Sequence, residues 1–275
     1  MKNLFYSLII FLDTAQENDI NYNIALFMAN NFYRIANMKI NEVAKECYVS
    51  PSSISRFCRT LGYDNFAHLK QECYSFHSND KKFNNLIHIP ASLMRDNPVS
   101  ATYDYVSKVT ENMNALSHSL DWNEIDKVLR LIHDSDNVAF FGTQFSQTAA
   151  LHFQTDLLML EKFTMAYMDL SRQLDCAKDL TQDSVAIIFT VNGNYKITAS
   201  KVFQYIKKSG CKVVLVTSNE SLDLGLDVDY KILIGNYENR STGKHNLLTT
   251  VELMSLRYYS LFYPSIEELQ EHIVQ

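Results

Sequence analysis

Five short apolar runs in the second half of the chain alternate with longer segments of helical periodicity. The runs are Asn137–Phe141, Phe163–Met168, Ser184–Thr190, Lys212–Thr217 and Tyr230–Ile234. Runs that are apolar at successive positions bury both faces of a strand, which is typical of a parallel sheet between layers of helices. The remaining segments with helical spacing are Asp121–Ser135, Ser146–Glu161, Tyr195–Ser209 and Asn246–Phe262. The pattern predicts an α/β fold with a five-stranded parallel sheet flanked by helices.

The first part of the chain has only helical periodicity. Ile40, Val43, Ala44 and Cys47, for example, recur at the i, i+3, i+4, i+7 spacing of one helix face. We therefore expect an all-α domain over residues 1–77. A polar stretch with two of the four prolines follows, and it predicts a linker and a connecting helix over 78–120. The α/β domain is expected over 121–275.

Composition restricts the class of protein. Of 275 residues, 47% are apolar and 20% are charged, and the net charge of −6 excludes a uniformly basic nucleic-acid coat. The five cysteines show no C-x-x-C spacing, which disfavours disulfides and a zinc ribbon. The longest apolar run, Leu8–Leu12, is too short to cross a membrane. We expect a cytoplasmic protein with no membrane partner, no bound metal and no cofactor.

The segment Ile40–Tyr63 has the pattern of a helix-turn-helix. An amphipathic helix is followed by a turn, then by Ser50 as the expected N-cap and Pro51 at the first helical position. Gly62 is placed to end this second helix. Residues on the expected outer face carry hydroxyl or guanidinium groups and no acid; they are Ser52, Ser53, Ser55, Arg56 and Arg59.

This outer face suits the DNA major groove, because small hydroxyl residues allow close approach and arginine binds base edges or phosphate. Between residues 34 and 70 there are six basic and three acidic residues, a local balance of +3. We predict that Ser52, Ser53, Ser55 and Arg56 read the operator and that Arg59 contacts phosphate. The spacing alone leaves an ordinary helical hairpin with a solvated face equally open.

Two glycine turns at the expected sheet edge indicate an anion site. Gly142 follows the first strand and Gly193 follows the third, and each turn leads into a helix whose N-terminus exposes backbone N–H groups. Ser146, Thr190 and Asn192 lie in the same loops and carry further polar groups. The alternative reading is that both are merely tight strand-to-helix turns.

The segment VSPSSISRFCRTLGYDNFAHLK resembles the recognition helix and following turn of RpiR-type transcriptional regulators. The matching positions include Arg56, Phe57, Cys58 and Gly62, and the resemblance covers about residues 24–76. It implies double-stranded operator DNA as a partner.

The order of helix-turn-helix, linker and parallel sheet is similar to this family's reader joined to a sugar isomerase (SIS) domain. The resemblance implies a phosphosugar effector bound by Ser/Thr-rich loops. The family's G-x-G-x-S loop corresponds to Gly142–Ser146, with Gln144 in place of the middle glycine. Its S-x-S-G-x-T loop corresponds to Thr190–Tyr195, with Asn192 and Tyr195 at two positions of phosphate donors. Lys196 next to this loop could offset the loss, or Tyr195 could fill the pocket.

We therefore predict a non-enzymatic transcriptional regulator of carbohydrate metabolism whose SIS domain senses a phosphosugar. We expect it to bind Gly142, Ser146, Thr190, Asn192, Gly193 and Tyr195, and we expect a homodimer or a dimer of dimers. One alternative is a constitutive DNA-binding dimer with a purely structural SIS domain. The other is a phosphosugar isomerase that uses Glu252 as base and His245 for ring opening.

Overall fold

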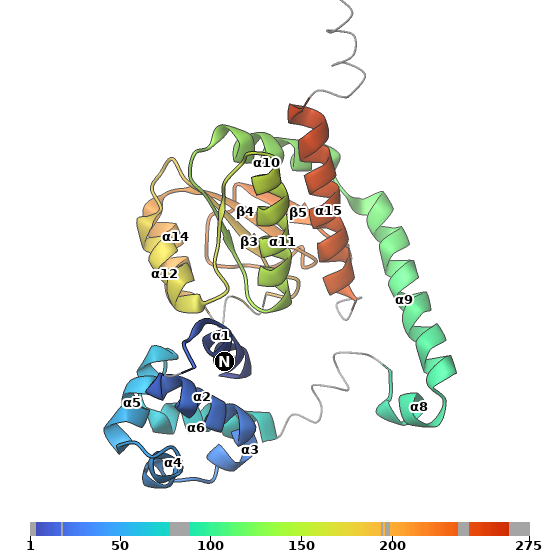
Figure 1. Cartoon of the computed structure of the whole chain (residues 1–275). Helices are drawn as coiled ribbons and strands as arrows, with labels where there is room; N and C mark the ends of the chain where they lie inside the picture. Colours follow the sequence, from blue (N-terminus) through green and yellow to red (C-terminus); the bar gives the residue numbers. More distant parts are fainter. Residues whose placement is uncertain are drawn as a thin grey trace, which may run out of the picture. The chain divides into compact units, whose positions relative to one another are not determined.

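The computed structural model describes residues 4–17, 19–77, 89–193, 195, 199–235 and 242–263. The chain divides into two compact units, Met1–Pro90 and Ala91–Gln275, which we call the helical unit and the sheet unit (Figure 1). Residues 78–88, most of the predicted linker before Pro90, lie outside the described residues.

The described residues of the helical unit form helices and no strand, as the periodicity predicts. The helices are α1 (Leu4–Thr14), α2 (Ile20–Asn30), α3 (Phe32–Ile35), α4 (Ile40–Glu46), α5 (Pro51–Thr60) and α6 (Phe66–His77). Their apolar faces meet in one core that includes Leu8, Ile24, Val43, Phe57 and Leu69. This core fixes α5 from behind, because Ile54, Phe57 and Cys58 are completely buried.

The sheet unit begins with three helices: α8 (Ala91–Asp96), α9 (Pro98–Ser119) and α10 (Trp122–Asp134). The strands and the helices between them then alternate: β1 (Val138–Phe141), α11 (Phe145–Met159), β2 (Met165–Ala166), α12 (Leu170–Asp179), β3 (Val185–Phe189), α14 (Ser200–Ser209), β4 (Lys212–Thr217), β5 (Tyr230–Leu233) and α15 (Gly243–Phe262). All five predicted strands are confirmed. Helices α8 and α12 were not predicted, and the helix expected from Tyr195 is described as regular only from Ser200.

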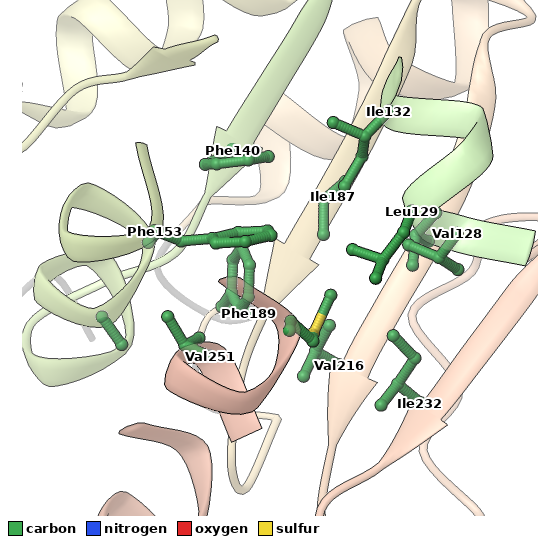
Figure 2. Packing of buried hydrophobic residues seen from close by; sticks show 14 of the residues in the cluster. Val128, Leu129, Ile132, Phe140, Phe153, Ile187, Phe189, Val216, Ile232 and Val251 are labelled. Carbon is green, nitrogen blue, oxygen red and sulfur yellow. The ribbon is translucent and has the colours of Figure 1, made fainter. Parts of the chain in front are cut away.

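The strands form one parallel sheet in the order β2-β1-β3-β4-β5. On one face, Phe140, Ile187 and Val216 pack against α10, α11 and α15; Figure 2 shows this layer, with Phe140, Phe153 and Phe189 close together. On the other face, Phe141, Ile188 and Leu215 pack against α12 and α14. Alternate residues of each central strand thus enter opposite cores, which is why the runs are apolar at every position.

Among the described helices, none combines the length and the apolarity needed to cross a membrane. The described residues also contain no group of three or more His, Cys, Asp and Glu side chains placed to hold a metal ion.

A buried carboxylate ties α6 to the start of α1 in the helical unit. Glu72 accepts hydrogen bonds from the Tyr63 hydroxyl (2.7 Å) and from the Leu4 backbone N–H (3.0 Å). Burial nevertheless raises the pKa of the Glu72 carboxyl above its ordinary value of 4.5, because the desolvation of the charged form outweighs these hydrogen bonds.

This raised pKa predicts a pH-dependent stability. The folded state holds the Glu72 proton more tightly than the unfolded state, so the stabilisation present at acidic pH is lost as pH rises through the raised pKa. Glu72→Gln removes the ionisation while the amide keeps an acceptor for Leu4 and a donor toward Tyr63. We expect this variant to gain stability over wild type as pH increases, in urea unfolding followed by circular dichroism. The only tryptophan, Trp122, reports the sheet unit separately by fluorescence. The exposed Glu46→Gln is the control, and an equal gain in that variant would contradict the assignment.

Candidate operator and effector sites

The two helices α4 and α5 form the predicted helix-turn-helix. Ser50 caps α5, with its Oγ accepting from the Ser53 N–H at 3.2 Å, and Pro51 is the first helical residue. At the other end, Gly62 has a φ of +82°. The Tyr63 N–H binds the Cys58 carbonyl and the Gly62 N–H binds the Arg59 carbonyl. This is the hydrogen-bond pattern with which glycine ends a helix, so both predicted ends of α5 are confirmed.

The outer face of α5 is polar and accessible. Ser52, Arg56 and Arg59 are exposed, while Ser53 and Ser55 are half-buried. The hydroxyls of Ser52 and Ser53 lie 2.7 and 3.0 Å from Ser50 Oγ, and Arg56 Nη2 donates to Ser53 Oγ at 3.4 Å. The start of α5 is therefore a cluster of hydroxyls that one arginine overlies. Its role in reading DNA stays a prediction.

Tyr48, in the turn between α4 and α5, was missed by the sequence reading. Its φ is +56°, a region that favours glycine, and its side chain is 97% exposed. A residue other than glycine costs energy in this conformation, and Tyr48 gains no packing that would compensate. The absence of glycine between Cys47 and Val49 was the available signal.

The second candidate site follows from the order of the strands. From β1 the chain crosses to β2 on one side, and β3 lies on the other side of β1. In open parallel sheets, such a reversal leaves a crevice outside the carboxyl ends of the two strands. Here those ends lead into the Gly142–Ser146 loop and the Thr190–Tyr195 loop, as predicted. The sheet therefore brings the predicted effector residues to one edge.

Gly142 lies in a crowded place at this edge. A Cβ atom there would be 3.1 Å from the Phe189 carbonyl oxygen, 3.1 Å from the Gln147 backbone nitrogen and 3.2 Å from Gln147 Oε1. Gln147 itself is completely buried, and neither polar atom of its side chain has a hydrogen-bond partner among the described residues. Buried amides are normally satisfied, so Gln147 marks a place for a polar group from outside the chain. The sequence reading did not select Gln147.

The second loop is held by its own polar groups. Thr190 Oγ1 accepts from the Gly193 N–H at 3.1 Å, and Ser218 Oγ donates to the Val191 carbonyl at 2.7 Å. Gly193 has a φ of +80°, and a Cβ there would be 2.5 Å from Leu222 Cδ1. The buried Oδ1 of Asn192 has no hydrogen-bond partner among the described residues. Asn194 and Lys196 lie outside the described residues.

Tyr195 lies in the core and not on a ligand surface. Only 1% of the residue is exposed, its ring packs edge-on against Phe203, and burial raises its pKa well above the ordinary value. Its hydroxyl donates to Gln173 Oε1, while Gln173 Nε2 donates to the carbonyls of Gly142 (3.0 Å) and Tyr167 (2.7 Å). Tyr195 thus joins the two loops through Gln173, a role that was not predicted.

The candidate catalytic pair is not assembled for catalysis. His245 Nε2 is 2.9 Å from the Tyr105 hydroxyl, and burial lowers the pKa of the imidazole. Glu252 is exposed, nearly two helical turns further along α15. The two groups therefore do not converge on one place.

Comparison with known proteins places this geometry in a family. Residues 13–79 match the model of the helix-turn-helix domain of the rpiR family. The N-terminal domain of the chain belongs to that family. The recognition of an RpiR-type transcriptional regulator is thereby confirmed.

The relatives of this RpiR-type chain extend the likeness beyond the helix-turn-helix. An HTH-type transcriptional regulator in the aarA 3′ region of Providencia stuartii is 25% identical over 198 residues, which cover 70% of this chain and 67% of the relative. The regulator RpiR of Escherichia coli K12 is 20% identical over 231 residues, which cover 84% and 75%.

Solved structures show the same fold. The Vibrio vulnificus NanR protein complexed with ManNAc-6P has a TM-score of 0.52 and 14% identity, covering 99% of this chain and 97% of its own. Escherichia coli CFT073 c3406, in complex with a phosphosugar, has a TM-score of 0.50 and 12% identity, covering 63% and 98%. The predicted fold class is confirmed, and the chain is a DNA-binding transcriptional regulator.

Gln144 keeps the backbone that the RpiR-type loop gives to glycine. Its φ is +53° with a ψ of −128°, and its side chain is exposed. Because that conformation is strained for any residue with a Cβ, we expect Gln144→Gly to stabilise the sheet unit by about 1 kcal/mol. Urea unfolding followed by Trp122 fluorescence measures the change. Thr155→Gly, at an exposed interior position of α11, is expected to destabilise instead. A loss of stability in both variants would contradict the strain.

Proposed function

We propose that the helical unit binds an operator through the outer face of α5 and that the sheet unit senses a phosphosugar. The single observation that supports the sensor most directly is the unpartnered, completely buried Gln147 amide beside Gly142, at the topological switch of the sheet. NanR and c3406, which share the fold, are each complexed with a phosphosugar, which is ManNAc-6P in NanR. We propose Gly142, Ser146, Thr190, Asn192 and Gly193 as the ligand loops, with Tyr195 supporting them from the core.

The proposed regulator is a homodimer without catalytic activity. A helix-turn-helix reader gains affinity and register from two half-sites. The absence of catalysis is supported by His245, which is hydrogen-bonded to Tyr105, and by the exposed Glu252. In this proposal the ligand changes DNA affinity by binding one arrangement of the two readers more tightly than another.

Arg56 is the first residue to test in DNA binding. With an operator selected from random duplexes, we expect Arg56→Ala to weaken specific binding by about 1–3 kcal/mol and to relax the sequence preference at one position. Arg59→Ala is expected to weaken binding to all sequences alike and to reduce the salt dependence by about one phosphate contact. Titrations at matched salt measure both. An unchanged operator affinity for Arg56→Ala would refute its assignment.

The effector is tested by thermal shift with a panel of hexose, amino-sugar and pentose phosphates beside the unphosphorylated sugars. A ligand at about 100 times its Kd stabilises the folded chain by about 2.7 kcal/mol. Ser146→Asp adds an acid to the first turn of α11, which the helix dipole tolerates but which repels a phosphate. We expect this variant to fold and to lose the shift, whereas Thr155→Asp, further along α11, keeps it.

The same experiment separates the alternatives. If wild type gives no shift with any phosphosugar, the sheet unit is structural and the regulator constitutive. If the phosphosugars are converted to isomers, the chain is an enzyme. We expect binding with the sugars recovered unchanged.

A further inference from the structure

Helix α9 carries an apolar face that its own unit leaves uncovered. It attaches to the sheet unit through a different face, on which Ala101, Asn112 and Leu116 are buried. On that face the Asn112 side chain donates to Thr242 Oγ1 at 2.6 Å, and the Tyr105 hydroxyl lies 2.9 Å from His245 Nε2. Helix α9 is therefore firmly held along one side, which fixes what the remaining surface presents.

The uncovered face is a stripe of large side chains with coiled-coil spacing. Val99 is 79% exposed, Tyr103 74%, Val106 54% and Met113 37%. Thr110, which is exposed, completes the series. The steps of four, three, four and three residues are those of heptad positions a and d, which form a straight seam when two helices pair. We call these five residues the α9 stripe.

The charges of α9 lie away from this stripe. At about 100° per residue, Asp104, Lys108 and Glu111 fall together on a third face of the helix. The positions that flank the stripe are uncharged; they are Ser100, Thr102, Ser107, Val109 and Asn114. Two copies of the stripe can therefore meet without like charges facing each other, whereas a charged partner would find no complementary group.

We propose that the α9 stripe pairs with the α9 stripe of a second copy of this chain. The interface is isologous, so the same residues contribute from both copies. Val106 is the middle residue of the five, and it meets its own counterpart at the two-fold axis whether the helices run parallel or antiparallel. The inference rests on the proposed dimer and adds the surface that forms it.

The first test measures the dimer directly, by sedimentation velocity of the full chain over a range of concentrations. Val106→Glu places two buried carboxylates beside each other at the axis, so we expect the dimer Kd to rise by about 100-fold or more. Leu256→Glu is the matched control: Leu256 is 66% exposed on α15, and its dimer is expected to remain. Circular dichroism verifies that both variants fold.

The second test uses new thiols. The native cysteines Cys58, Cys73, Cys176 and Cys211 are buried. Val106→Cys is expected to give a covalent dimer under mild oxidation, whereas Asp104→Cys, on the charged face, gives little.

The outcomes separate the proposals. A wild-type chain that stays monomeric overturns both the dimer and the stripe. A wild-type dimer that survives Val106→Glu and does not cross-link through Val106→Cys overturns the stripe alone. Loss of the dimer only in Leu256→Glu moves the interface to α15.

Discussion

Burial of both faces of the parallel sheet is the constraint on which the rest of the sheet unit depends. The strands β1, β3 and β4 carry side chains into two separate cores, so helices must cover both faces. The connections that place helices there make the strands parallel, and parallel strands end at one edge. The loops after β1 and β3 meet at that edge only because the strand order reverses at β1. The candidate effector site is thus a consequence of how the hydrophobic cores are built.

Much of this architecture could be predicted from sequence, because burial and helix capping leave local signals. The five strands are apolar at successive positions, and Ser50, Pro51 and Gly62 mark the ends of α5. Helix α12 was not predicted because the same stretch reads as a polar connection. Its buried Gln173 and Cys176 show that it covers the sheet all the same.

The details of the candidate site could not be predicted, because they depend on contacts between distant segments. Tyr195 looks like a bulky intrusion into a phosphate loop when it is compared with the family pattern. In the structure it points into the core and reaches Gln173, 22 residues away, which in turn holds the Gly142 carbonyl. Gln147 carries no sequence signal at all, since an unpaired buried amide is recognised only once its surroundings are known.

The altered effector loops therefore differ in chemistry more than in shape. Gln144 retains a glycine-like backbone, and Gly193 and Thr190 hold the second turn. The same edge is also connected to α9, because the buried Asn112 donates to Thr242 just before α15, and Asn246 on α15 donates to the Ile234 carbonyl after β5. A ligand that moves this edge acts on the helix that carries the α9 stripe. In a dimer paired through that stripe, effector binding and the arrangement of the two copies share one element, which is the physical requirement for coupling them.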